Sequence, residues 1–102
     1  MSAPEALFQR KPMEVDIGGA KVHVRSMTLR EAMEVDRLNE SGKSIDAATY
    51  AVTHCLVSES GAELFNGDAD RVQDIPLDTL QILSDAIRDM STARKTKELS
   101  KN

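Results

Sequence analysis

The sequence contains no tryptophan, a single cysteine and no long apolar run. One cysteine, Cys55, excludes a disulfide within the chain, which is consistent with a reducing compartment. No apolar run approaches the roughly 20 residues that a membrane-spanning helix requires, so no membrane span is predicted. The first twelve residues also lack the apolar core of a secretory signal peptide. We therefore expect a cytoplasmic protein.

Aromatic side chains are scarce, with Phe8, Tyr50 and Phe65 the only ones in 102 residues. The core must therefore be built from aliphatic side chains. Such a core is typical of helices that pack on one another or on a small sheet. A chain of this length predicts a single domain.

Acidic residues outnumber basic ones, and four basic residues gather near the end of the chain: Arg94, Lys95, Lys97 and Lys101. The whole chain has 13 basic and 17 acidic residues, a net charge of −4. The last eleven residues hold those four basic residues and one acidic residue. Without them, 9 basic and 16 acidic residues remain, a net charge of −7. An acidic body repels phosphate backbones, so no nucleic-acid partner is expected. Residues 93–102 are predicted to be a polar, basic tail that frays.

Residues 1–12 are predicted to be a flexible arm, because Pro4 and Pro12 interrupt helix and strand alike. The arm carries one adjacent apolar pair, Leu7 and Phe8. Two interpretations of this pair stay open. It either docks on a neighbouring subunit or folds back on its own domain.

Residues 13–25 carry the alternating apolar and polar pattern of two β-strands. Gly18–Gly19 between them suits a two-residue hairpin turn, which needs positive φ angles. Pairing around this turn places the apolar residues on one side: Met13, Val15, Ile17, Ala20, Val22 and Val24. The other side pairs complementary residues: Asp16 with Lys21 and Glu14 with His23. An isolated hairpin is marginal, so its apolar side needs helices beneath it or a further strand beside it.

Two helices are predicted after the hairpin. Thr28 and Glu31 form a capping box at the start of a helix over residues 29–40. Ser44 is a candidate cap for a second, alanine-rich helix over residues 45–58. This second helix is the most apolar and is expected to lie at the centre of the fold. Its inward residues are predicted from helical spacing: Ile45, Ala48, Val52, Cys55 and Leu56.

The rest of the chain predicts a turn and two more helices. A short helix near residues 68–74 would begin at Asp68 or Asn66. The last helix, over residues 76–92, has a proline in its first turn. The predicted fold class is α+β, mostly α, with one domain over residues 13–92.

No set of residues suited to catalysis or metal binding emerges from the pattern. The acidic group in residues 66–74 resembles a calcium loop, but Arg71 and Leu77 stand where glycine and glutamate are needed. Helix capping explains this group better. His54 and Cys55 are helical neighbours that point about 100° apart, so they cannot face one substrate together. Cys55 is interpreted as a small buried hydrophobic residue. We predict no enzyme activity, no cofactor and no metal.

The ordered elements resemble the tail assembly chaperones of long-tailed, non-contractile bacteriophages and prophages. Members of that family commonly have a short hairpin, a helix of the form "lTl.E", an alanine-rich helix and a segment like "v.d.dG..lF". The corresponding stretches here are "VDIGGAKVHVRSMTLREAMEVDRL" and "YAVTHCLVSESGAELFNGDADRVQDIPLDTLQILSDAIRDM". The resemblance covers residues 13–92 and departs at Asp89–Met90, where the family frequently has Leu-Asn.

The resemblance implies a helper of tail construction in the cytoplasm of the bacterial host, not retained in the virion. Such a protein binds the tape-measure protein and keeps it soluble until tube subunits polymerise around it. A longer form made by ribosomal frameshifting recruits tail-tube protein, and the present chain resembles the short form. We also expect a homo-oligomer, because many copies acting together raise avidity.

Our hypothesis places the partner surface on the apolar stripes of the first and last predicted helices. Its residues are Leu29, Met33, Leu80, Leu83, Ile87 and Met90. An unassembled tape measure exposes apolar helical stripes that aggregate, and an aliphatic surface can cover them. Two alternatives stay open: a structural head–tail or tail component of a phage particle, and a small cytoplasmic regulatory adaptor. Presence in purified particles would favour the first, and a gene beside a toxin or operon the second.

Overall fold

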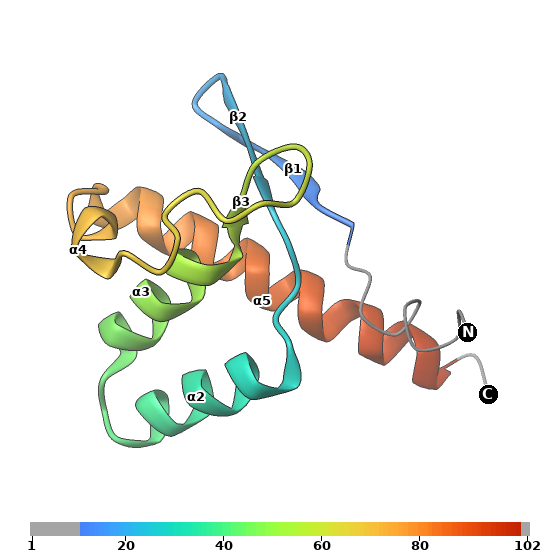
Figure 1. The fold of residues 1–102 in the computed structure, drawn as a ribbon. Helices are drawn as coiled ribbons and strands as arrows, with labels where there is room; N and C mark the ends of the chain where they lie inside the picture. The colour runs from blue at the N-terminus through green and yellow to red at the C-terminus, as the bar shows by residue number, and fades with distance from the viewer. Residues whose placement is uncertain (1–10, 101–102) are drawn as a thin grey trace, which may run out of the picture.

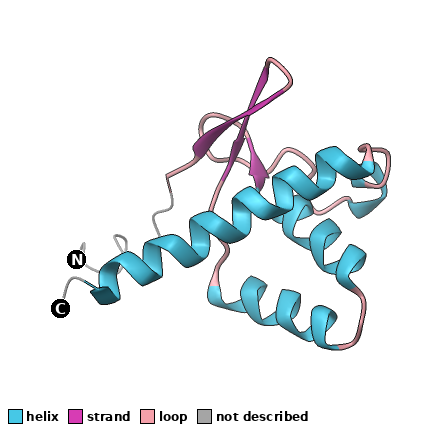
Figure 2. Cartoon of the chain, turned by 180° about the vertical axis from the view of Figure 1, so that it is seen from behind, coloured by secondary structure: helices cyan, strands magenta, loops and turns pink. Residues whose placement is uncertain are grey.

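The structure, a computed structural model, describes the backbone of residues 11–100 and the side chains of residues 11–92. It confirms an α+β fold, mostly α, in which a three-stranded antiparallel sheet packs against helices (Figures 1 and 2). Lys11 and Pro12 have no regular secondary structure, and the rest of the predicted arm lies outside the described residues. Within the described part, no helix has both the length and the apolar character needed to cross a bilayer.

The N-terminal hairpin forms in the predicted register. Strands β1 (Met13–Ile17) and β2 (Ala20–Val24) are antiparallel, and every residue pair matches the prediction. The turn between them has φ of 58° at Gly18 and 94° at Gly19, a region that residues with a side chain rarely adopt. Four apolar residues of the hairpin pack against the core: Val15, Ile17, Val22 and Val24.

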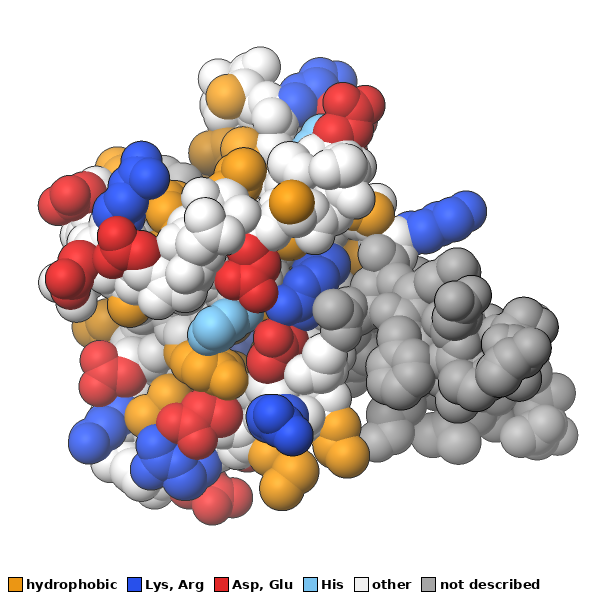
Figure 3. Space-filling view, viewed as in Figure 1, with side chains coloured by type: hydrophobic (Ala, Val, Ile, Leu, Met, Phe, Trp, Pro, Cys, Tyr) orange, Lys and Arg blue, Asp and Glu red, His pale blue; other side chains and the backbone are white. Residues whose placement is uncertain are grey.

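The polar side of the hairpin differs from the prediction in one detail. Lys21 faces Asp16 in the register, but its Nζ lies 3.7 Å from Oε2 of Glu14, on the diagonal. Asp16 instead accepts a hydrogen bond of 2.8 Å from the N–H of Gly19 and so stabilises the turn. Figure 3 shows charged side chains and a histidine gathered at this hairpin.

Helix α2 (Leu29–Glu40) begins and ends where predicted. The N–H of Glu31 donates to the Thr28 hydroxyl at 3.2 Å, and the N–H of Thr28 donates to the Glu31 carboxylate at 2.9 Å. This confirms the capping box. The helix ends at Glu40 with Ser41 as its C-cap, and Gly42 follows with a φ of 78°.

Helix α3 (Ser44–Cys55) ends three residues before its predicted end at residue 58. Leu56–Val57 form strand β3, which pairs antiparallel with β2 and completes the sheet order β1-β2-β3. Strand pairing here satisfies backbone groups of β2 that a continued helix would leave without partners. The predicted cap is also wrong, because α3 begins after Lys43 without a side-chain hydrogen bond at its start.

The short helix α4 (Ala69–Val72) lies within its predicted range. The carboxylate of Asp68 accepts a hydrogen bond of 3.1 Å from the N–H of Asp70 and caps this helix. Val72 points inward and is fully buried, as predicted. Asp68 and Asp70 therefore serve the start of α4, in agreement with the capping role that the sequence favours.

Helix α5 (Leu77–Ser100) extends beyond the predicted range of 76–92. Residues 93–100, predicted to fray, continue the helix, and residues 101–102 lie outside the described residues. The segment ARKTKELS is rich in residues with good helix propensity and contains neither glycine nor proline, so nothing in it stops the helix.

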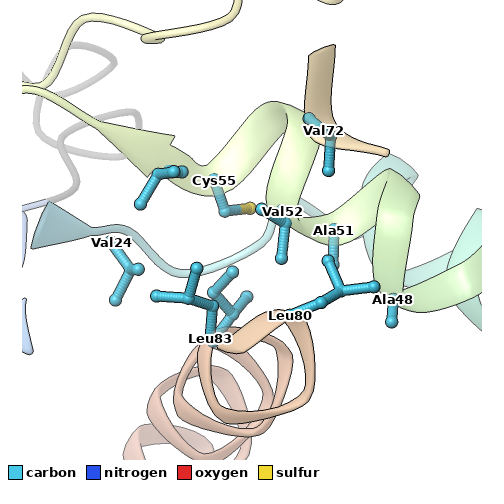
Figure 4. Packing of buried hydrophobic residues seen from close by; sticks show 10 residues of the cluster. Val24, Ala48, Ala51, Val52, Cys55, Val72, Leu80 and Leu83 are labelled. Carbon is cyan, nitrogen blue, oxygen red and sulfur yellow. The ribbon is translucent and has the colours of Figure 1, made fainter. Parts of the chain in front are cut away.

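The core lies between α3, α5 and the apolar side of the sheet. Its buried residues are nearly all aliphatic: Val24, Ala48, Ala51, Val52, Cys55, Leu56, Val72, Leu80, Leu83 and Ile87. Figure 4 shows Leu80 and Leu83 of α5 facing the small residues of α3. α3 packs against α2, α4 and α5, which confirms its predicted central place.

Two isoleucines of α5 provide a matched test of this core. Ile87 is 0 % exposed and Ile82 is 48 % exposed. We expect Ile87→Ala to lower the free energy of unfolding by about 2–5 kcal/mol, because it removes transferred apolar atoms and leaves a cavity. Ile82→Ala should change it by no more than about 0.5 kcal/mol. Urea denaturation of both variants checks this, and equal losses would contradict the packing of α5.

Candidate functional site

A groove with a volume of about 510 Å³ lies between α2 and α5, and α3 forms its floor. Both walls pack against α3. Its lining includes Met27, Ala32, Val35, Asp36, Ile45, Ala47, Ala48, Ala51, Gln81, Ser84, Arg88 and Ser91. We call this surface the α2–α5 groove. The floor is mostly alanine, the α2 wall carries both apolar and polar side chains, and the α5 wall carries polar side chains. A bound molecule would therefore contact an apolar floor between polar rims.

The α2–α5 groove is closed at one end by the segment that joins β2 to α2. The N–H of Met27 donates a hydrogen bond of 2.9 Å to Oγ of Ser91, and that hydroxyl donates to the carbonyl of Ile87 at 2.8 Å. These bonds tie the connection to α5. They hold the start of α2 at a set distance from the opposite wall.

Three large apolar side chains are exposed in the groove or at its edge. Ile45, 60 % exposed, lines it directly. Leu29 and Met33, 78 % and 62 % exposed, each stand three residues before a lining residue, Ala32 and Asp36. Residues three apart are neighbours on a helix surface, so Leu29 and Met33 lie on the part of α2 beside the groove, although neither lines it. Figure 3 shows hydrophobic side chains at the surface in this region, beside basic ones.

The α5 part of the predicted partner surface is not available in this structure. Leu80, Leu83 and Ile87 are buried in the core, and Met90 is half-buried against it. The reason is that the apolar stripe of α5 faces α3 and supplies the core of a chain that has few aromatics. Of the six predicted residues, Leu29 and Met33 are exposed. Ile45, predicted to face inward, is the exposed residue that helical spacing alone missed.

A buried ion pair holds the start of α2 against α3 and the sheet. Arg25 is 5 % exposed, and its Nη1 and Nη2 donate to Oε1 and Oε2 of Glu31 at 2.8 and 2.9 Å. The N–H of Arg25 also donates to the carbonyl of Cys55 at 2.9 Å. Oε2 of Glu63 lies 3.8 Å from Nη2. The guanidinium thus joins the end of β2, α2, α3 and the segment after β3.

Both members of this pair are charged. Burial opposes ionisation of Glu31, but hydrogen bonds from Arg25 and from the N–H of Thr28 outweigh it and lower the pKa of Glu31 to about 2, from 4.5. The hydrogen bond to Glu31 raises the pKa of Arg25 above its ordinary value. A charged, doubly hydrogen-bonded pair of this kind has a defined geometry, so it orients the α2 wall of the groove.

His54 and Cys55 have different surroundings. Nδ1 of His54 lies 3.7 Å from Oε1 of Glu63, and its ring is 4.7 Å from the ring of Tyr50. Cys55 is fully buried, as predicted, with Sγ 3.5 Å from Nη1 of Arg25. The polar neighbours of Cys55 are not evident from the sequence, because they come from segments distant along the chain.

Among the described residues, no three His, Cys, Asp or Glu side chains are arranged to hold a metal ion. Comparison of the chain with protein-family models, curated proteins and solved structures finds no match. The features of the chain that bear on function are therefore the α2–α5 groove, the exposed residues around it and the sequence pattern.

Removal of one partner of the Arg25–Glu31 pair tests its structural role. We expect Arg25→Met to lower the free energy of unfolding by up to about 3 kcal/mol, because it leaves the partly buried Glu31 carboxylate without its counter-charge. Arg25→Met combined with Glu31→Gln should cost less, since glutamine keeps the capping box. Arg37→Met, which breaks an exposed pair with Glu34, is the matched control. Equal losses for Arg25→Met and Arg37→Met in urea denaturation would refute the role.

The lowered pKa of Glu31 also predicts a pH dependence. A carboxyl whose pKa is lower in the folded state stabilises the fold above its unfolded pKa and loses that effect as the pH falls. The contribution of Glu31 should be complete above pH 4.5 and should disappear between pH 4.5 and about 2. Stability of the natural chain should therefore fall more steeply in this range than that of Glu31→Gln. Parallel curves in thermal unfolding would show that the pair does not act in this way.

Proposed function

We propose that this protein is a tail assembly chaperone of a long-tailed phage or prophage. It binds the tape-measure protein in the bacterial cytoplasm and is not retained in the virion. Two observations support the proposal: the ordered resemblance over residues 13–92, and the α2–α5 groove with apolar residues exposed around it. The exposure of Ile45 in the groove, with Leu29 and Met33 exposed on the adjoining surface of α2, is the observation that carries it.

An amphipathic helix is the kind of partner that this groove suits. Helix-in-groove recognition places apolar residues at positions i, i+3, i+4 and i+7 of the partner against an apolar floor. The alanine floor lets a partner approach closely, because small side chains permit short distances between helix axes. Covering a large apolar side chain contributes about 1.5–3 kcal/mol.

The polar rims of the groove would orient the bound helix. Asp36 lines the α2 wall and Arg88 lines the α5 wall. A partner with a basic residue towards Asp36 and an acidic residue towards Arg88 fits one direction better than the other. The net charge of −4 would keep loaded complexes apart in solution.

A contact this small calls for several copies along one partner. A tape-measure protein is a long helical chain that offers repeated apolar stripes, so a homo-oligomer of the chaperone gains avidity without strong single contacts. Recruitment of tail-tube protein through a longer, frameshifted form belongs to the same proposal.

Co-expression with the tape-measure protein tests the proposal. The natural chain should keep it soluble, and the double variant Leu29→Ser with Met33→Ser should let most of it precipitate. The matched control is Leu64→Ser with Ile82→Ser, because both residues are about half exposed and both lie outside α2. This control should keep the tape-measure protein soluble.

If the tape-measure protein is equally soluble with and without this chain, the chaperone role is ruled out. The presence of the protein in purified phage particles would instead favour a structural head–tail or tail component. Mass spectrometry of purified particles separates these two outcomes.

A further inference from the structure

Strand β1 forms an open edge of the sheet. The order β1-β2-β3 gives β1 a single neighbouring strand (Figure 1). At the other edge, β3 is covered by the segment that follows it, because Val57 forms a bridge with Glu63. The N–H of Ser58 also donates to the carbonyl of Ala62 at 2.8 Å. Within residues 11–100, the edge that lacks a neighbouring segment is therefore that of β1.

The backbone groups on this edge are those of Glu14 and Asp16. Directly after β2, the N–H of Arg25 donates to the carbonyl of Cys55 at 2.9 Å, on the side of β3. Successive residues of a strand point their N–H and C=O groups to opposite sides, so Val24 points its groups towards β1. Its partner on β1 points back towards it, and the same alternation turns the groups of Glu14 and Asp16 outward. No described residue pairs with them.

Two carboxylates stand beside this edge on the polar face of the hairpin. Glu14 and Asp16 are both exposed. Oε2 of Glu14 lies 3.7 Å from Nζ of Lys21, and Oδ1 of Asp16 accepts the hydrogen bond from Gly19. The other oxygen of each carboxylate has no hydrogen bond or ion pair with a described residue. Both carboxylates can therefore contact a cationic side chain on a strand that lies along β1.

The other face of the same edge is apolar. Met13 is 40 % exposed, and Val15 and Ile17 are half-buried against the core. A strand that lies along β1 would place alternate side chains beside these three residues and the others beside the two carboxylates. The edge therefore presents an apolar row on one face and a negative row on the other.

We propose that β1 binds an extended segment of another protein in which basic and apolar residues alternate. Such a segment adds a strand to the sheet, and its basic side chains lie opposite Glu14 and Asp16. A second copy of β1 does not fit this edge, because full overlap of two copies places Glu14 opposite an acidic residue in either direction. The described lining of the α2–α5 groove contains no residue of β1, so this site is independent of the proposed function.

A capped, fluorescein-labelled peptide of alternating lysine and valine tests the proposal by fluorescence anisotropy. It should bind the natural chain, and a glutamate–valine peptide should not. The lysine amides and the valine amides point to opposite edges of the extended peptide, so N-methylation of one set should abolish binding and N-methylation of the other should preserve it. Absence of binding overturns the proposal. Equal binding with either set methylated also overturns it, because charge alone then holds the peptide.

Charge reversal tests the part played by Glu14. We expect Glu14→Lys to weaken binding of the lysine–valine peptide about tenfold, because an opposite-charge pair across the strands becomes a like-charge pair. Glu40→Lys is the matched control, because it makes the same change in net charge at an exposed site on α2. It should change the affinity by less than about twofold, since salt screens distant charges. Equal weakening by the two variants overturns the proposal, because the peptide is then attracted to the whole acidic molecule.

Hydrogen exchange measured by NMR identifies any other occupant of the edge. In the free protein, the amides of Glu14 and Asp16 should exchange faster than those of Val15 and Ile17, and the peptide should slow them. Slow exchange of Glu14 and Asp16 in the free protein overturns the proposal. If that protection is the same at every protein concentration, another part of the chain covers the edge, and if it is lost on dilution, a second copy does.

Discussion

Arg25 is buried, Glu31 is partly buried beside it, and each stays charged because the other lies within hydrogen-bonding distance. Their contact joins segments that approach one another only in the folded chain: the end of β2, the first turn of α2, the end of α3 and the segment after β3. Burying two charges is costly, and paired geometry with further hydrogen bonds offsets the cost. The pair therefore specifies one placement of α2. That placement decides where one wall of the α2–α5 groove stands.

The aliphatic core explains why α2 and α5 differ in what they leave at the surface. α5 lies along α3 and under the sheet, and its stripe of Leu80, Leu83 and Ile87 is consumed by the core. α2 contributes one buried residue, Leu38, and its other large apolar side chains lie partly or mainly outside. A helix held mainly by its first turn and one inward face leaves the rest of its apolar surface exposed. This asymmetry is the reason that the proposed partner contact is placed on the α2 side.

Reversible covering of an apolar surface is what the proposed function requires of the α2–α5 groove. A chaperone must release its partner when tube subunits replace it, so single contacts of modest strength suit the task and several copies supply the total affinity. An apolar groove that stands open is itself an aggregation hazard.

Local interactions made part of this structure predictable from the sequence. The hairpin register depends on a glycine turn and on alternation within thirteen residues, and the start of α2 depends on Thr28 and Glu31, three residues apart. Tertiary structure decided the rest. Leu56–Val57 leave the helical pattern because the edge of β2 offers them backbone partners, and α5 turns its apolar stripe inward because α3 needs covering. The exposure of Ile45 and the partners of Arg25 likewise depend on residues distant along the chain, and no periodicity within a segment reports such contacts.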